Sequence, residues 1–228
     1  MITGGIAVNV LVFSPHPDDD IIGCGGSIAR HIQKGNHVAI VYMTSGEFGS
    51  LEHLPEDLAR IREVEATEAA RSLGVTALTF LRNHDGDLKY NKENLHRIAS
   101  LIRAKKPTLI YLPHSHDSVP DHQTTHRLVM EGCRRAAGPW FPEYGQQPWQ
   151  VETLLGYEVW TPIQSVGHSE DISNFIAAKL EALQMHRTQT KFIKYDDAIQ
   201  GLNRYRGIMT GKGDYCEYFQ LIRTVYKG

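Results

Sequence analysis

Apolar strand-like stretches and amphipathic helix-like stretches alternate along most of this chain, and the alternation limits the folds it can adopt. Strands are predicted at 7–13, 37–44, 77–81, 108–112 and 151–160, and helices at 21–34, 57–73, 91–105, 121–137, 171–189 and 195–209. Short strands separated by helices predict a mostly parallel sheet that is covered on both faces. We therefore expect an α/β, Rossmann-like three-layer sandwich, with a site at the carboxyl ends of its strands.

Composition narrows the class of protein further. With 228 residues, 41% of them hydrophobic, the chain can bury a full core, and we expect one domain spanning 1–228. A net charge of −2, with both signs spread along the sequence, gives no basic face for nucleic acid. Cys24, Cys133 and Cys216 lie far apart and form neither a metal-binding pattern nor a disulfide framework, which is typical of a reducing compartment. No apolar stretch is long enough to span a membrane and no basic leader precedes the first strand, so we expect a cytoplasmic protein.

Polar side chains follow each of the first four predicted strands. They are His16, Glu47 and Asp85 after the first three strands, and His114, His116 and Asp117 after the fourth. Because the carboxyl ends of parallel strands meet at one edge of a sheet, these side chains are expected to converge there.

The densest group of such side chains is the run from Ser14 to Asp20, read SPHPDDD, where the first strand ends and a helix begins. His16 and Asp19 are three residues apart, and His122 opens a later helix, so all three are candidate metal ligands. Two imidazoles and one carboxylate leave a coordination position open, which is typical of catalytic zinc. Asp18 fits a base that takes a proton from water, and Asp121 could orient an imidazole.

Each of these residues has an ordinary explanation when taken alone. Asp20 is typical of a helix start, His114 and His116 of a surface, and Arg62 of a solvated helix face. The His-Pro-Asp-Asp sequence after one strand, combined with Asp-His after a later strand, is rare by chance.

Those two motifs carry a resemblance that runs nearly from end to end. The chain resembles the PIG-L/LmbE superfamily of zinc-dependent N-acetylglucosamine de-N-acetylases, which includes bacillithiol- and mycothiol-pathway deacetylases. Supporting similarities are Cys24 to Ile28, Thr44 to Glu47, Arg62-Glu63, Leu73 to Val75, Tyr157 to Trp160, Asp171-Ile172 and the 179–189 helix.

The resemblance implies hydrolysis of the N-acetyl group of an amino sugar or sugar conjugate, with one Zn²⁺ per chain or another divalent metal in its place. It implies His16, Asp19 and His122 as ligands and Asp18 as the general base. Arg62 matches an arginine that contacts the polar end of the substrate, and Asp85 matches an acidic residue that binds sugar hydroxyls. The expected partner is a small acetylated sugar, with no nucleic acid and no membrane span, in a homo-oligomer such as a trimer or hexamer.

One position departs from the family pattern. Members with the second motif His-x-Asp-His use its first histidine to stabilise the oxyanion or protonate the amine, and here Val119 stands in that place. Either His114 or His116 reaches in from the same loop, or Asp18 moves the proton both ways with Asp121 in a changed role. A slow or inactive protein is the third alternative.

Two other functions are open at this point. A metal-dependent phosphoesterase would need a second set of carboxylates, and only Asp20 and Asp117 remain without another role for it. It would also need several cationic side chains around the phosphate, and Arg62 is the only candidate that the sequence offers. A degenerate sugar-binding protein with little activity would explain Val119 but has no use for Asp18. Metal analysis together with acetate release separates the three readings.

The sequence leaves the particular sugar open. Glu47, the 141–149 loop, His186 and Arg187 are predicted to shape the choice of substrate. The aromatic residues Trp140, Phe141, Tyr144 and Trp149 could stack on a sugar or cover a subunit interface.

Overall fold

The computed structural model describes residues 7–145 and 147–225, and its centre is one seven-stranded sheet in the order β3-β2-β1-β4-β5-β7-β6. The strands are β1 (Asn9–Ser14), β2 (His37–Thr44), β3 (Ala77–Asn83), β4 (Leu109–Pro113), β5 (Thr153–Tyr157), β6 (His168–Asp171) and β7 (Cys216–Thr224). Strands β1 to β5 are parallel, whereas β7 runs antiparallel to both β5 and β6. The predicted mostly parallel α/β sheet is confirmed.

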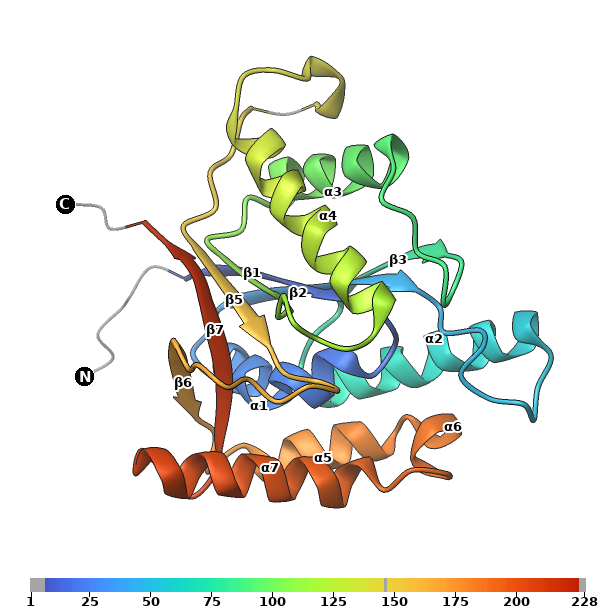
Figure 1. The fold of residues 1–228 in the computed structure, drawn as a ribbon, viewed down its shortest axis with the longest axis vertical. Coiled ribbons are helices and arrows are strands. Elements are labelled where there is room, and N and C mark those ends of the chain that lie inside the picture. The colour runs from blue at the N-terminus through green and yellow to red at the C-terminus, as the bar shows by residue number, and fades with distance from the viewer. Residues whose placement is uncertain (1–6, 146, 226–228) are drawn as a thin grey trace.

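Helices cover both faces of this sheet (Figure 1). One face carries α1 (Asp19–Gln33), α2 (Pro55–Ser72), α5 (Ile176–Gln184), the short α6 (Arg187–Thr190) and α7 (Tyr195–Thr210). The other face carries α3 (Lys92–Lys105) and α4 (Pro120–Ala137), followed by a short 3₁₀ helix at Pro142–Tyr144. The expected three layers are therefore present. Within the described ranges, no helix is both long and apolar enough to cross a membrane.

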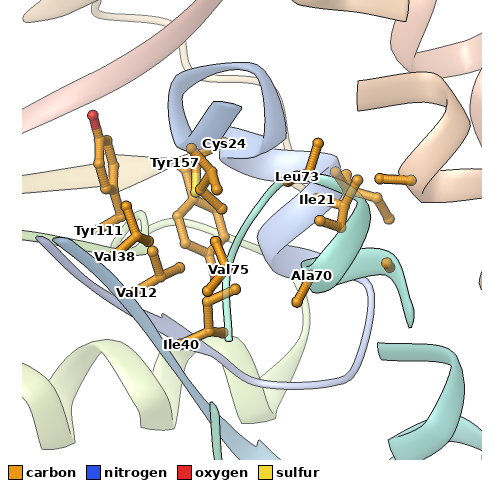
Figure 2. Close-up of a cluster of buried hydrophobic side chains, with 14 of the residues drawn as sticks. Val12, Ile21, Cys24, Val38, Ile40, Ala70, Leu73, Val75, Tyr111 and Tyr157 are labelled. Atoms are coloured by element: carbon orange, nitrogen blue, oxygen red, sulfur yellow. The ribbon is translucent and has the colours of Figure 1, made fainter. Parts of the chain in front are cut away.

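Strand β1 is apolar along its length because both of its faces are buried. Val10 and Val12 join the core under α1 and α2, while Leu11 and Phe13 point into the core under α3 and α4. Figure 2 shows the first of these cores, in which the ring of Tyr157 lies near Cys24 of α1. The close fit is seen at Gly23 of α1, where an added Cβ would lie 2.2 Å from the Tyr157 ring.

The sheet changes direction at β1, and this change positions the site. The chain moves from β1 to β2 and β3 on one side, then crosses to β4 and β5 on the other. Ligands bind at such a switch point, in the crevice beyond the carboxyl ends of the strands. The segment that follows β1 and the segment that follows β4 meet there, although about a hundred residues separate them in the sequence.

The predicted elements of the last third need correction. The helix predicted over 171–189 begins only at Ile176 and ends at Gln184, and the backbone leaves helical geometry at His186 before the short α6. Its first residues instead close the edge of the sheet: Ile172 N donates to the Tyr215 carbonyl, and the Asp171 carboxylate accepts from Ser173 N. The strand predicted over 151–160 ends at Tyr157.

Strands β6 and β7 were not predicted. The first four residues of β7, Cys216 to Phe219, are all buried, so the polar and apolar alternation that indicates a half-exposed strand is missing. The buried glutamate among them, Glu217, bonds to the side chain of Lys179 and to the backbone of Gly26 and Ser27. The position of β7 therefore depends on long-range contacts, and no local sequence pattern predicts it.

Candidate active site

Three ligating atoms converge at the switch point of the sheet. His16 Nδ1 lies 3.1 Å from Asp19 Oδ2, His122 Nε2 lies 3.2 Å from the same oxygen, and the two ring nitrogens are 3.3 Å apart. In a tetrahedral zinc site with bonds of about 2.0–2.1 Å, neighbouring ligand atoms are about 3.3 Å apart. These residues therefore have both the donor types and the spacing of three corners of a zinc tetrahedron.

The electrostatics of this cluster favour a positive charge. Burial by itself would lower the pKa of His122, but the Asp19 carboxylate and Asp117 together raise it to about 9. Burial would raise the pKa of Asp19, and the two imidazoles hold it well below its usual range. A cation between these groups would replace the proton that the cluster otherwise retains.

Further carboxylates lie close to the outer nitrogens of both imidazoles. His16 Nε2 lies 3.0 Å from Asp85 Oδ1 and 3.3 Å from Asp121 Oδ2. His122 Nδ1 faces Asp117 Oδ1 at 3.4 Å. A neutral imidazole that ligates through one nitrogen carries its proton on the other, and a carboxylate there fixes the tautomer and the ring orientation.

These carboxylates are themselves held by backbone amides. Asp121 accepts from Gly86 N at 2.8 Å and from Leu88 N at 3.1 Å. Asp117 accepts from Trp160 N at 3.0 Å and from Val119 N at 3.1 Å. This orienting role of Asp117 was not predicted from the sequence. Its position five residues before His122, directly after β4, was the available signal.

Asp18 lies beside the ligand cluster and in the same cavity. It is 6% exposed, and burial raises its pKa to about 7 even though the Arg62 guanidinium, 3.1 Å away, opposes the shift. Its backbone has a φ of 133°, a conformation that non-glycine residues rarely adopt and that the surrounding structure must hold in place. The result is a carboxylate with a pKa suited to proton transfer near neutral pH.

Arg62 is clamped rather than free. It is 3% exposed, and its guanidinium donates to Gly46 O at 2.9 Å, to Pro17 O at 2.7 Å and to Asp18. Gly46 has a φ of +66°, and an added Cβ there would lie 2.1 Å from Arg62 Nη1. Contact between Arg62 and a substrate stays a prediction, because its observed partners are backbone oxygens and Asp18.

Asp20 points away from this cavity. Its carboxylate accepts a hydrogen bond from the Tyr42 hydroxyl at 3.0 Å, and its backbone N donates to Ser14 Oγ. Burial raises its pKa to about 7. It therefore supports the end of β1 from behind and does not line the site.

The cavity itself has a volume of about 350 Å³. Its described lining is His16, Asp18, Asp19, Ile22, Phe48, Gly49, Arg62, Asp85, Gly86, Val119, Pro120, Asp121, Trp160, Gln189 and Tyr195. Three aromatic residues belong to this wall, and two of them, Phe48 and Trp160, are 54% and 50% exposed. None of the three was singled out as a candidate site residue from the sequence.

The aromatic residues of the 138–149 loop lie elsewhere. This loop follows the end of α4 that is far from the site (Figure 1). Several of its backbone carbonyls accept hydrogen bonds from the guanidinium of Arg103, near the end of α3. Trp149 Nε1 donates to the Pro107 carbonyl. The expectation that this loop could stack on a substrate sugar in the site is wrong, since its residues do not line the cavity.

The two histidines offered as replacements at Val119 also lie outside the cavity. His114 Nε2 is 2.7 Å from the Thr161 carbonyl, and His116 is exposed with its ring on Ser115 Oγ. Both line a separate cavity of about 440 Å³. Val119, in contrast, lines the site itself and presents an apolar wall.

Fold and site together define an α/β protein with a candidate metal centre at the switch point of its sheet. A family model described as PIG-L, GlcNAc-PI de-N-acetylase, matches residues 11–133. The chain belongs to this family, and it is an enzyme of the N-deacetylase class. The matched range contains the candidate metal ligands His16, Asp19 and His122 together with Asp18, Arg62, Asp85 and Asp121.

Individual proteins extend the similarity beyond that range. The chain is 30% identical to a diacetylchitobiose deacetylase of Thermococcus kodakarensis over 229 residues, covering 95% of this chain and 84% of that protein. It is also 30% identical to a 1D-myo-inositol 2-acetamido-2-deoxy-alpha-D-glucopyranoside deacetylase of Thermomonospora curvata, with 79% and 80% covered. Among solved structures, an N,N'-diacetylchitobiose deacetylase from Pyrococcus horikoshii, in complex with an inhibitor, has a TM-score of 0.86 at 28% identity, covering 95% and 84%.

Proposed function

We propose that this protein is a zinc-dependent hydrolase that removes the acetyl group from an N-acetylglucosamine-type sugar or sugar conjugate. One observation carries the proposal: a buried carboxylate, Asp18, lines the same cavity as His16 and Asp19, whose ligand atoms converge with that of His122. A structural metal site has no use for such an additional carboxylate, whereas amide hydrolysis requires a base.

His16, Asp19 and His122 would hold the zinc, and their spacing and donor types fit it. Zinc bound there supplies Lewis acidity, which polarises a carbonyl and makes a water molecule easier to deprotonate. Asp85, Asp121 and Asp117 keep the two imidazoles in the ligating tautomer. Another divalent metal with similar ligand preferences would fit the same donors.

Asp18 is the proposed base. It takes the proton from the attacking water and returns it to the departing amine, so that one carboxylate serves both halves of the reaction. The burial of Asp18 and the charge of Arg62 act on its pKa in opposite directions. This shuttle needs no histidine at position 119, and the distant placement of His114 and His116 supports it.

The site and the relatives together support the proposed substrate class. Both named relatives act on N-acetylglucosamine units, linked to a second sugar or to inositol. Phe48 and Trp160 offer exposed rings at the cavity, and aromatic faces pack well on sugars. The phosphoesterase alternative has less support, because Nη1 and Nη2 of Arg62 already donate to other groups and the described lining holds no lysine or second arginine.

We further propose that residues 1–228 form a single deacetylase domain that works in the cytoplasm. The sheet, to which strands from both halves of the chain contribute, supports one domain. The three cysteines are buried free thiols, as a reducing compartment favours. The trimer or hexamer stays a prediction, which light scattering after size-exclusion chromatography tests.

A substrate panel tests the proposed function. Purified zinc-loaded protein is incubated with N-acetylglucosamine, diacetylchitobiose, an inositol-linked N-acetylglucosamine and an aryl phosphate ester. We expect acetate release from at least one acetylated sugar, its loss with a chelator and its return with added zinc. Phosphoester hydrolysis without acetate release would contradict the proposal.

A further inference from the structure

The wall of the active-site cavity at Val119 has no side-chain hydrogen-bond donor. An amide that is attacked by water develops negative charge on its oxygen, and a donor placed at that oxygen contributes strongly to catalysis. His114 is bonded to the Thr161 carbonyl and His116 lies outside the cavity. Another side chain of the lining can supply the donor instead.

Tyr195, the first residue of α7, is such a side chain. It is half-buried and lines the same cavity as Val119, Asp18 and Asp19. Within residues 7–145 and 147–225, its hydroxyl makes no hydrogen bond, so the donor is not already committed. Burial and the charges of Asp18 and Asp19 raise its pKa to about 12, which keeps the phenol protonated at neutral pH.

The ring of Tyr195 is held from the side of the metal site. It packs edge-on against Trp160, with ring centroids 5.9 Å apart and an interplanar angle of 77°. The backbone N of Trp160 donates to Asp117, whose other oxygen faces His122 Nδ1. The residue that orients a candidate zinc ligand therefore also anchors the aromatic side chain on which Tyr195 packs.

We propose that the Tyr195 hydroxyl donates a hydrogen bond to the acetamide oxygen as that oxygen gains negative charge, in place of the side chain missing at Val119. The inference rests on the proposed deacetylase function. The O–H bond of Tyr195 is not broken in this step, because Asp18 carries the proton between water and amine. Tyr195 is thus a catalytic residue, and it lies outside the family's matched range.

The variant Tyr195→Phe removes the hydroxyl and keeps the ring against Trp160. We expect kcat for acetate release to fall by about 10²- to 10³-fold, the loss typical of one oxyanion donor, with KM changed by less than about threefold. Tyr205→Phe is the matched control, since Tyr205 lies on the same helix, is 57% exposed and does not line the cavity. This control should retain wild-type kcat.

Adding Val119→His to Tyr195→Phe tests whether the two positions serve the same oxygen. The double variant should recover kcat by about tenfold or more, since a histidine then supplies the donor. Calorimetry gives a readout apart from turnover: Tyr195→Phe should weaken binding of a tetrahedral phosphonamidate analogue of the acetamide by about tenfold or more, and leave binding of the deacetylated amine unchanged.

The outcomes are distinguishable. An active wild type in which Tyr195→Phe keeps kcat within about threefold and binds the phosphonamidate normally overturns this inference alone. If Val119→His does not restore the kcat that Tyr195→Phe loses, the claim that positions 119 and 195 serve the same oxygen is overturned. A wild type that releases no acetate from any sugar overturns the proposed function and this inference with it.

Discussion

Arg62 Nη2 lies 3.1 Å from Asp18 Oδ2 in the floor of the cavity, with both side chains nearly inaccessible to water. The pair sets the proton affinity of the proposed base. Burial raises the pKa of Asp18, the positive charge of Arg62 opposes this rise, and the net result is a pKa of about 7. Because the two effects oppose each other, removing one of them must change the pH at which the enzyme works.

Replacing Arg62 by methionine should therefore shift the pH profile. Without the positive charge, the pKa of Asp18 rises, so the base is protonated at higher pH and the acidic limb of kcat/KM should move up by about one unit or more. The pH dependence of acetate release measures this shift. Arg60→Met, on the exposed side of the same helix, is the control, and an unmoved limb in Arg62→Met would contradict the account.

Replacing Asp117 by asparagine should weaken metal binding. Asparagine removes the negative charge beside His122 Nδ1 and leaves one acceptor oxygen for the groups that now share two, so the ligating tautomer loses support, and we expect about 10- to 100-fold lower zinc affinity. Competition with a chromogenic chelator measures the affinity. Asp87→Asn, at an exposed position near the site, should bind zinc as the wild type does, and equal affinities for all three proteins would argue against this role of Asp117.

The buried His186 predicts sensitivity to acid. Both of its ring nitrogens are buried without a hydrogen-bond partner in the described structure, and burial together with Arg62 lowers its pKa to about 3. The unfolded chain binds a proton at this residue below pH 6.5, whereas the folded chain does not until about pH 3. As the pH decreases from about 6.5 to about 3, the free energy of unfolding should therefore decrease, by up to about 1.4 kcal/mol per pH unit.

A His186→Gln variant checks this sign. In metal-free protein, the decrease in unfolding free energy between pH 7 and pH 5 should be smaller than in the wild type, by roughly 2 kcal/mol at most. Urea denaturation at the two pH values measures it, with the exposed His53→Gln as control. The same pH dependence in wild type and His186→Gln would show that His186 is not the acid-sensitive group.

The buried ion pair between Lys179 and Glu217 should be important for stability. Lys179 Nζ is 2.7 Å from Glu217 Oε1, and Glu217 also accepts from Gly26 N and Ser27 N, at the point where the kinked α1 resumes. Lys179→Met leaves an unpaired buried carboxylate, which costs about 3–5 kcal/mol. Urea denaturation measures the loss, which should exceed that of Arg204→Met in the exposed pair with Asp214, about 1 kcal/mol or less.

The core of the site was predictable from the sequence for a topological reason. His16 and Asp19 follow β1 and His122 follows β4, and these strands are neighbours at the switch point, so local patterns suffice to bring the three together. Strand and helix patterns also placed β2 and α3 to within a residue of their observed bounds. The features that could be predicted from the sequence are thus those that depend on strand order and on local periodicity.

Other parts of the site depend on packing between distant loops. Tyr195 lies at the start of α7, and the helix before it was predicted as one element over 171–189, whereas the structure has α5 and α6 separated at His186. Trp160 is placed by its backbone bond to Asp117. Sequence periodicity carries no information on such contacts, so residues of this kind were missed, whereas strand order was enough to place the candidate metal ligands together.

The most direct test of the account is the behaviour of Asp18→Asn, which keeps the volume of the side chain and removes the base. Zinc content by mass spectrometry and acetate release are measured on the same preparation. We predict about one zinc per chain, as in the wild type, with kcat reduced by about 10²- to 10⁴-fold. A zinc-loaded Asp18→Asn protein that releases acetate at close to the wild-type rate would contradict the central claim.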